Sequence, residues 1–368
     1  MTNQPDSRMK VIYHEAMTDY CPPPGLFDCL PSDLLEIQMT QPERPEKLVN
    51  TASVLKRGPI GQHLDWDTAR SASDEEILAF HTDSYLDRLK KAAENGEYLS
   101  ASTYIYPPSL KAMYLAAGAS IEAARAVISG DYKMAYALVR PPGHHAQPNE
   151  ADGYCFVNNL GLAVHEALNA GYKRVAVVDW DVHHGNGTQE GFYDRDDVLT
   201  ISLHMNHGSW GEGHLQTGEV DEVGKGDGEG NNLNLPLPMG AGDHAYKLTM
   251  ERCVGPALRK FKPDLIFCAN GQDANAFDPN GRQSVSMAGF YEMACQLKAL
   301  ADELCGGKIV MTQEGGYNPT YAPYCAHSIV EGLLGLPMEL EDPLAFYPND
   351  LEGGERAVEE LIARHPLL

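Results

Sequence analysis

A cluster of ionisable side chains between residues 179 and 184 is the part of the sequence best equipped for chemistry. It contains Asp179, Asp181, His183 and His184, and it directly follows the apolar run Val175–Val178. Side chains two residues apart on an extended chain point to the same side, so Asp181 and His183 would project together. Burying such groups at the end of a strand is costly unless a cation offsets their desolvation. The pattern therefore predicts half of a metal site, in preference to a solvated polar loop.

Three further polar segments each follow a strand-like apolar run. They are Arg140–His145 after Ala135–Val139, Asn270–Asn275 after Asp264–Ala269, and Glu314–Tyr317 after Lys308–Gln313. Ligands bind at the carboxyl ends of strands in open parallel sheets, so we expect these loops to converge with the first one. Each segment alone is a weak signal, because a His-His pair or a Gly-Gly turn is common. Their shared position favours a metal-dependent hydrolase.

The residue types suggest how such a site would work. Asp181, His183 and Asp273 would give an ion three protein ligands and leave a position for water, as catalytic zinc sites do. Iron(II) would also suit this set of ligands. Binding to such an ion can lower the pKa of water to about 7, which makes hydroxide available at neutral pH.

A proton acceptor and an oxyanion partner can be predicted as well. His144 and His145 are two candidates for the general base, with Asp179 and Asn186 as plausible partners that fix their tautomers. A charged partner raises the pKa of a histidine, whereas a neutral partner leaves it nearer 7, so the two would differ in role. Tyr317 could present its hydroxyl to a developing oxyanion.

Alternating strand-like and helical patterns predict an α/β fold with a parallel sheet covered on both faces. We expect strands at Lys10–His14, Ala135–Val139, Arg174–Asp179, Val198–Leu203, Asp264–Ala269 and Lys308–Gln313. Helices are expected at about 109–130, 160–170, 243–261, 287–304, 321–334 and 355–364. No low-complexity linker divides the chain, so we expect one domain over residues 1–368, with a Pro-rich loop insertion at 21–41.

Two long segments, 21–41 and 207–232, are expected to be loops that are functional or contact a neighbouring subunit in a homo-oligomer. The net charge of −24 argues against a nucleic-acid partner, and would steer cationic ligands towards the protein. No apolar run is long enough to predict a membrane span, and the N-terminus does not look like a signal peptide. Eight scattered cysteines without a CxxC pair fit a reducing cytoplasm, where we expect the protein to be located.

Several motifs resemble those of the histone deacetylase superfamily, which includes bacterial histone deacetylase-like amidohydrolases and acetylpolyamine amidohydrolases. They are Gln41–Leu48, Phe80–Thr82, Arg140–Ala146, Asp179–Gln189 and Glu314–Tyr317, and Arg140, Asn186 and Glu314 look like the class II type. The resemblance implies the arginase–deacetylase fold, with a central parallel sheet of about eight strands flanked by helices. It also implies hydrolysis of an acyl-lysine peptide or of a small acetylated amine. The compact layout leads us to expect a bacterial source.

The same resemblance implies roles for individual residues. Asp181, His183 and Asp273 would bind zinc, His145 would be the general base and later the acid, with His144 as an electrostatic helper, and Tyr317 would polarise the carbonyl group. A structural K⁺ or Na⁺ would lie near Asp179, Asp181, His183, Ser202 and Leu203, and a second near Phe192 and Val198. The substrate tunnel would be lined by Gly153, Tyr154, Trp210, Gly315 and Gly316.

Two departures from the family pattern concern the substrate. Tyr154 replaces the usual tunnel phenylalanine, and Ser102 stands where many relatives carry an acidic rim residue that grips a peptide backbone. Two other readings remain: an arginase-like two-metal ureohydrolase, and an inactive homologue that binds an acylated ligand. The first needs more bridging carboxylates than Asp181 and Asp273 supply. Homologues of the second kind usually lose the tyrosine or a metal ligand, and this chain has both.

Overall fold

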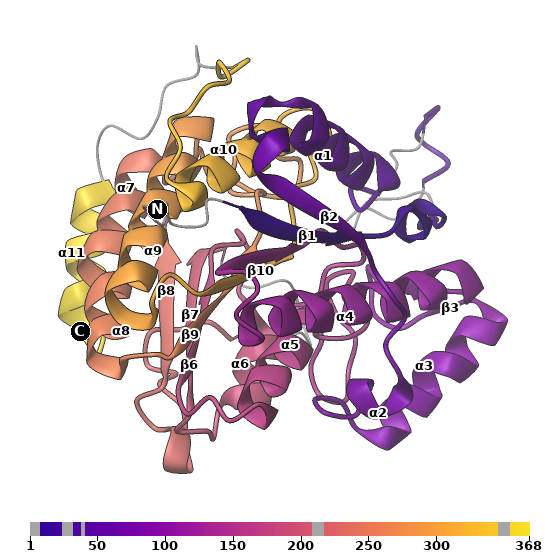
Figure 1. Ribbon diagram of the computed structural model, residues 1–368. Helices are drawn as coiled ribbons and strands as arrows, with labels where there is room; N and C mark the ends of the chain where they lie inside the picture. Colours follow the sequence, from indigo (N-terminus) through magenta and orange to yellow (C-terminus); the bar gives the residue numbers. More distant parts are fainter. Residues whose placement is uncertain (1–7, 24–31, 38–40, 208–216, 345–353) are drawn as a thin grey trace.

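Eight parallel strands form the centre of the computed structural model, which describes residues 8–23, 32–37, 41–207, 217–344 and 354–368 (Figure 1). Their order across the sheet is β2-β1-β5-β10-β9-β6-β7-β8. The strands are β1 (Met9–Tyr13), β2 (Leu64–Thr68), β5 (Met134–Ala137), β6 (Val175–Asp179), β7 (Val198–Met205), β8 (Asn232–Leu237), β9 (Leu265–Asn270) and β10 (Ile309–Gln313). The predicted α/β fold with a parallel sheet of about eight strands is therefore confirmed.

The four central strands, β5, β10, β9 and β6, are buried along their whole length. Strands covered on both faces read as continuous apolar runs, and the sequence predicted all four. The two strands that it missed, β2 and β8, lie at the edges of the sheet. β8 alternates asparagine with leucine and contains Pro236, a residue tolerated in sheets mainly at edges.

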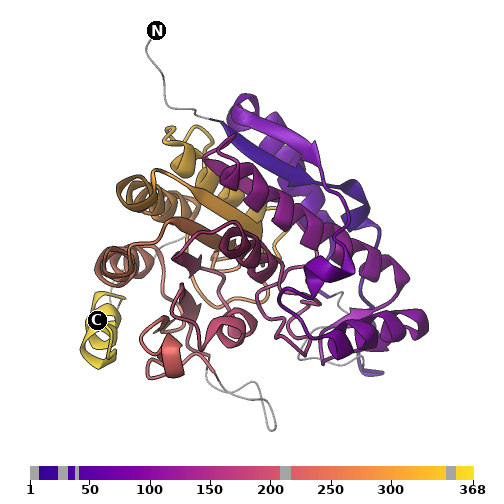
Figure 2. The same ribbon diagram turned by 60° about the horizontal axis from the view of Figure 1, so that its bottom comes forward.

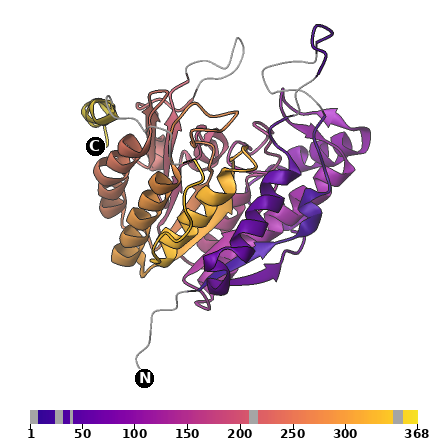
Figure 3. The same ribbon diagram turned by 90° about the horizontal axis from the view of Figure 1, so that it is seen from above.

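Helices cover both faces of the sheet. On one face α1, α10, α9, α7 and α8 lie side by side, and on the other face lie α4, α5 and α6 (Figures 1 and 3). Their bounds are α1 (Pro45–Arg57), α4 (Pro107–Ile128), α5 (Asn159–Asn169), α6 (Asn186–Phe192), α7 (Asp243–Thr249), α8 (Gly255–Phe261), α9 (Met287–Cys305) and α10 (Ala322–Leu334). The C-terminal helix α11 (Gly354–Arg364) packs on α7 at the β8 edge (Figure 2). Two further helices, α2 (Asp74–Ile77) and α3 (Asp83–Asn95), precede a small antiparallel hairpin of β3 (Glu97–Tyr98) and β4 (Tyr104–Ile105).

The single helix expected over 243–261 is interrupted. A π-helical turn at Met250–Val254 separates α7 from α8. Pro256 has no amide hydrogen and cannot donate to the carbonyl group of Arg252, so the regular hydrogen-bond ladder cannot run through this point. A wider turn just before a proline is one way in which a helix accommodates such a break.

The described part of the chain contains no helix that is long and apolar enough to cross a membrane. Of the two long predicted loops, the structure describes 21–23, 32–37 and 41 in the first, and 207 with 217–232 in the second. The second includes a short 3-10 helix at Gly226–Gly228. The expectations of a single domain and of a subunit contact through these loops remain predictions.

Candidate metal centre and active site

The four polar loops leave four adjacent strands, β5, β10, β9 and β6, at their carboxyl ends. Backbone amides of one loop donate hydrogen bonds to carboxylates of another: Gly143 to Glu314 (2.6 Å), Gly315 to Asp181 (2.7 Å) and Val182 to Asp273 (2.8 Å). The predicted convergence of the loops is therefore present in the structure. The contacts also fix the orientation of the carboxylates, since each has a rigid amide donor.

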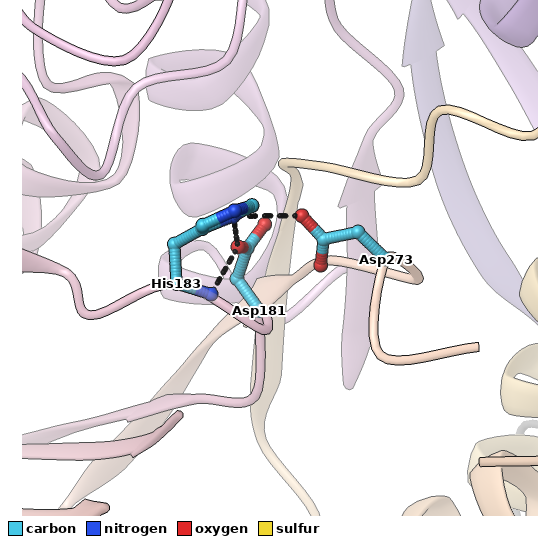
Figure 4. A group of neighbouring side chains, drawn as sticks. All are labelled: Asp181, His183 and Asp273. Atoms are coloured by element: carbon cyan, nitrogen blue, oxygen red, sulfur yellow. Dashed lines mark hydrogen bonds and ion pairs between the residues drawn. The ribbon is translucent and has the colours of Figure 1, made fainter. Parts of the chain in front are cut away.

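Asp181, His183 and Asp273 form a compact group of buried metal-ligand types (Figure 4). Asp181 and His183 come from the loop after β6, and Asp273 comes from the loop after β9. Nδ1 of His183 lies 3.1 Å from Oδ1 of Asp181 and 3.1 Å from Oδ2 of Asp273. Two ligand atoms that are each about 2.1 Å from an ion at a tetrahedral angle would be about 3.4 Å apart. The spacing therefore fits ligands that share one ion.

The space and charge around these side chains also fit a cation. A Cβ atom added at Gly315 would lie 2.0 Å from Oδ2 of Asp273 and 2.6 Å from Oδ2 of Asp181, so only glycine leaves the carboxylates room. Burial and the negative charge of Asp181 raise the pKa of Asp273 to about 7. A bound cation would relieve this repulsion. The two carboxylates and one imidazole could hold a divalent ion such as zinc.

His144 and His145 have different partners. Nδ1 of His144 lies 2.9 Å from Oδ2 of Asp179, and Nδ1 of His145 lies 2.6 Å from Oδ1 of Asn186. The ring centroids are 4.0 Å apart. His144 is buried, whereas His145 retains some exposure. The pairing of the two histidines with one charged and one neutral partner is the arrangement that the sequence suggested.

The pKa values of the two histidines move in opposite directions. Burial alone would lower the pKa of His144, but the carboxylates of Asp181 and Asp179 outweigh it and hold this pKa well above its usual range. Loss of solvation, and then the positive charge of His144, hold the pKa of His145 well below its usual range. The sequence-based expectation that a neutral partner leaves the pKa of a histidine nearer 7 left out these two effects. His145 is thus neutral and able to accept a proton, while His144 is charged.

Tyr317 lies in the loop after β10, close to the metal-ligand group. Its pKa is raised well above the usual range by burial, and next by the charges of Asp181 and Asp273, so its hydroxyl stays protonated. The ring of Tyr154 meets the ring of Tyr317 edge to face, with centroids 5.6 Å apart. The ammonium group of Lys47 also lies over the ring of Tyr317, 4.6 Å from its centroid. A protonated hydroxyl beside two metal-binding carboxylates can donate to an oxygen that becomes negative.

The residues predicted to line the tunnel divide into three groups. Gly153 and Tyr154 adjoin the histidines: a Cβ atom at Gly153, where φ is 49°, would lie 2.2 Å from Cδ2 of His145. Gly315 and Gly316 precede Tyr317, as the motif requires. Trp210 lies outside the described residues.

The rim position predicted at Ser102 is not exposed: Ser102 is only 2 % exposed, so its hydroxyl is not presented to solvent. Its neighbour Thr103 instead accepts a hydrogen bond from the backbone amide of Tyr154, at 2.9 Å. The segment therefore restrains the backbone of Tyr154, a residue predicted to line the tunnel.

The residues predicted to bind monovalent cations lie in two separate places. Asp179 pairs with Ser202 across β6 and β7, Leu203 follows Ser202 on β7, and Oδ1 of Asp179 accepts a hydrogen bond from the backbone amide of Asp181 at 3.0 Å. Phe192 ends α6, and Val198 begins β7 at the amino end of that strand. The structure thus brings the first set together beside Asp181 and His183, and places the second set near the opposite end of β7.

Two residues that the sequence did not single out contact the site. Asp278 accepts hydrogen bonds from the backbone amides of Tyr317 (2.7 Å) and Asn318 (3.3 Å). Lys47 forms a buried ion pair with Glu43 (2.5 Å) and donates to the carbonyl oxygen of Glu314 (3.2 Å). Asp278 reads as part of a turn with Pro279. Lys47 belongs to the motif Gln41–Leu48, but this motif lies far in the sequence from the four polar loops, so no contact with the site was predicted for it.

Comparison with known proteins places this geometry in a family. The family model described as "Histone deacetylase domain" matches residues 41–333. The chain belongs to the histone deacetylase family. It is 47% identical to "Histone deacetylase 8" of Arabidopsis thaliana over 364 residues, which cover 98% of this chain and 97% of that protein. It is 41% identical to the "Histone deacetylase-like amidohydrolase" of Pseudomonas aeruginosa over 305 residues, covering 82% of this chain and 79% of the relative.

A solved structure agrees with these relatives. The HDA15 HD domain superimposes with a TM-score of 0.82 at 33% identity, covering 96% of this chain and 95% of that one. Membership of the family confirms the prediction of a metal-dependent deacetylase enzyme with this fold. The relatives include plant, bacterial and archaeal proteins, so the expected bacterial source remains a prediction. Among the described residues there is one group of three metal-ligand types, and its two carboxylates are fewer than a two-metal ureohydrolase needs to bridge its ions.

Proposed function

We propose that this protein is a zinc-dependent amidohydrolase that removes an acetyl or related acyl group from an amine. The observation that carries the proposal is the placement of two histidines, one 2.9 Å from a carboxylate and one 2.6 Å from an amide oxygen, and of a tyrosine around one buried Asp-His-Asp group. Iron(II) is the alternative ion for the same ligands. The amine is either the side chain of an acylated lysine in a peptide or a small acetylated amine.

The residues would divide the work as follows. An ion held by Asp181, His183 and Asp273 would polarise the acyl carbonyl group and make water more acidic. His145, kept neutral and oriented by Asn186, accepts the proton of the attacking water. The hydroxyl of Tyr317 donates to the carbonyl oxygen as negative charge develops on it. When the amide C–N bond breaks, His145 returns the proton to the leaving amine. The carboxylic acid that forms then gives up the second proton of the water, so the products are a carboxylate and an ammonium ion.

The charged His144 has a supporting role. Its positive charge lowers the pKa of His145 and so keeps the neighbouring ring ready to accept a proton. The carboxylate of Asp179 holds that charge in place at 2.9 Å. Charges fixed before the reaction stabilise a transition state without the cost of reorganising solvent.

The experiment is turnover by the purified protein on acetyl-lysine peptides, acetylputrescine and acetylspermidine, with and without a chelator. We expect acetate release that the chelator stops and that zinc or iron(II) restores. Turnover on polyamines alone would make this a small-molecule amidohydrolase, and turnover on peptides would make it a protein deacylase. Absence of turnover on every substrate, in protein that carries its metal, would contradict the removal of acetyl groups.

A pair of variants tests the metal site separately. Asp181→Ala removes one ligand, and we expect it to lose bound metal when the content is measured by elemental analysis. Asp227→Ala, an exposed residue in the short helix Gly226–Gly228, is the control and should retain the metal. Retention of metal by Asp181→Ala would remove Asp181 from the ligand set.

A further inference from the structure

Asp278 is a buried carboxylate that joins the loop after β9 to the loop after β10. Oδ2 accepts hydrogen bonds from the amides of Tyr317 (2.7 Å) and Asn318 (3.3 Å). Oδ1 accepts from the amides of Asn280 (2.8 Å) and Gly281 (3.2 Å). Asp278 is buried, and four amide donors satisfy its carboxylate. The position therefore suits a group that only accepts hydrogen bonds.

The backbone before Tyr317 cannot hold this residue by itself. Gly315 is fixed, because its amide donates to Asp181 (2.7 Å) and its carbonyl oxygen accepts from the amide of Gln272 (3.1 Å). Gly316 follows with a φ of 119°, a conformation that side-chain-bearing residues rarely adopt. Glycine has the widest choice of backbone conformations, so the fixed position of Gly315 does not determine where Tyr317 lies. The restraint on the amide of Tyr317 itself comes from Asp278.

The other end of the Asp278 loop is tied to the metal-ligand group. Gly281 packs so closely on the backbone of Asp273 that an added Cβ atom would lie 2.0 Å from the carbonyl oxygen of Asp273. One carboxylate therefore connects the backbone beside a metal ligand with the backbone of the tyrosine. The ring of Tyr317 has separate neighbours, Tyr154 and Lys47, which limit its rotation but do not set the position of its backbone.

We propose that Asp278 is a positioning residue that holds Tyr317 at the distance from the Asp-His-Asp group at which its hydroxyl can serve the reaction. This inference rests on the proposed function, because it assigns Asp278 a part in the same hydrolysis through Tyr317. The hydrogen bonds of Asp278 go to four backbone amides, so it acts through the position of Tyr317. A displacement of a reacting group by about 1 Å can cost about 10²-fold in rate, so loss of this restraint is expected to lower kcat.

The test is a double-mutant cycle between Asp278→Asn and Tyr317→Phe. The asparagine has nearly the same shape, but its amide nitrogen would face two backbone N–H groups instead of accepting from them. We expect Asp278→Asn to lower kcat by about 10- to 100-fold, with KM changed less than about threefold and metal content unchanged. In the Tyr317→Phe background the same change should lower kcat by less than about threefold, because the hydroxyl that Asp278 positions is already absent.

The matched control is Asp264→Asn. Asp264 also accepts two backbone amides through one oxygen, those of Lys173 and Arg174, but it does so at the amino end of the sheet. Its kcat should stay within about threefold of the wild type. If Asp278→Asn does not fold, Asp278→Ser, which is smaller and adds no opposing amide group, takes its place in the cycle.

Three results would overturn the proposal. They are an equal loss of kcat in both backgrounds, a kcat within threefold of the wild type, and a loss of bound metal that accounts for the lower rate. The binding of an alkyl hydroxamate is also measured for the wild type, the two single variants and the double variant. This measurement tests the proposal without relying on turnover. If the wild type hydrolyses none of the acetylated amines, the proposed function fails. The positioning role would still be supported if Asp278→Asn weakens hydroxamate binding in the protein with Tyr317 but not in the Tyr317→Phe background. Equal weakening in both backgrounds would reject it.

Discussion

His144 and His145 are neighbours in the sequence with rings 4.0 Å apart, but their surroundings differ in every respect that controls a proton. His144 is buried against the carboxylate of Asp179, whereas His145 is partly exposed and contacts the amide oxygen of Asn186. The pKa of the first is held high and that of the second is held low. The carboxylates around His144 hold its pKa up, whereas the partner of His145 is an amide oxygen and not a carboxylate, so loss of solvation and nearby positive charge hold its pKa down.

The two environments also depend on each other. The charge of His144 is the second largest reason, after loss of solvation, for the low pKa of His145. Glu314 contributes to the arrangement through the backbone, since its carboxylate accepts from the amide of His144 at 3.1 Å. A change at one histidine should therefore alter the pKa of the other. Three variants test how different the roles of the two histidines are.

The largest effect is expected from His145→Ala. It removes the group that accepts and returns the proton, and we expect kcat to fall by about 10³-fold with the metal retained. Steady-state kinetics and metal analysis check this. His63→Ala, a histidine of the 3-10 helix Pro59–His63, is the control and should stay close to the wild type. A loss of less than tenfold in His145→Ala would mean that another group carries the proton.

A smaller effect is expected from His144→Ala. The proton acceptor remains, but its positively charged neighbour is lost, so we expect kcat to fall by about 10- to 100-fold. The pKa of His145 should rise at the same time, because imidazolium at His145 is no longer opposed by a nearby positive charge. The pH dependence of kcat/KM would show this as an acidic limb at higher pH. A larger loss than that of His145→Ala would indicate that the two histidines have exchanged roles.

The fold was predictable where burial leaves a strong pattern in the sequence. The apolar runs of β6, β9 and β10 predicted the central sheet, and their polar continuations predicted which loops would meet. The edge strand β8 was not predicted, because its asparagines look like loop residues. In the folded protein their amide nitrogens have partners: Asn232 and Asn234 both donate to the side-chain oxygen of Gln189, at 2.9 and 2.8 Å.

The site was predictable for residues whose side chains act directly and was hidden for those that act through the backbone. Asp181 and Tyr317 belong to motifs whose chemistry can be inferred from residue type. Asp278 has the appearance of a turn residue before Pro279, and its four amide partners come from two different loops. Lys47 reaches the carbonyl oxygen of Glu314 across 267 positions of sequence. Such contacts depend on the tertiary structure and cannot be predicted from the spacing of residues in the sequence.

The smallest effect on maximal rate, and the sharpest test of the comparison, is expected from Asn186→Asp. This change gives His145 the kind of partner that His144 has, a carboxylate 2.6 Å or so from Nδ1 in place of the amide oxygen. A carboxylate favours the charged imidazolium, so the pKa of His145 should rise by about 1 to 3 units. His145 accepts a proton only when neutral, which means that activity is lost as the pH falls through its pKa. The acidic limb of kcat/KM should therefore move to higher pH, with activity reduced at neutral pH and recovered to within a few-fold in more alkaline buffer.

Two further variants separate the pKa effect from other consequences of the new charge. The carboxylate of Asp152 lies 3.5 Å from the amide nitrogen of Asn186, so Asn186→Asp would bring two negative groups together. Combining it with Asp152→Asn removes this repulsion, and the shift of the acidic limb should persist. Asn231→Asp adds the same charge beside the carbonyl oxygen of Arg195, away from the histidines, and should leave the limb in place. If Asn186→Asp also leaves it in place, the partner of His145 does not set its proton affinity, and loss of solvation together with the charge of His144 determines its low pKa.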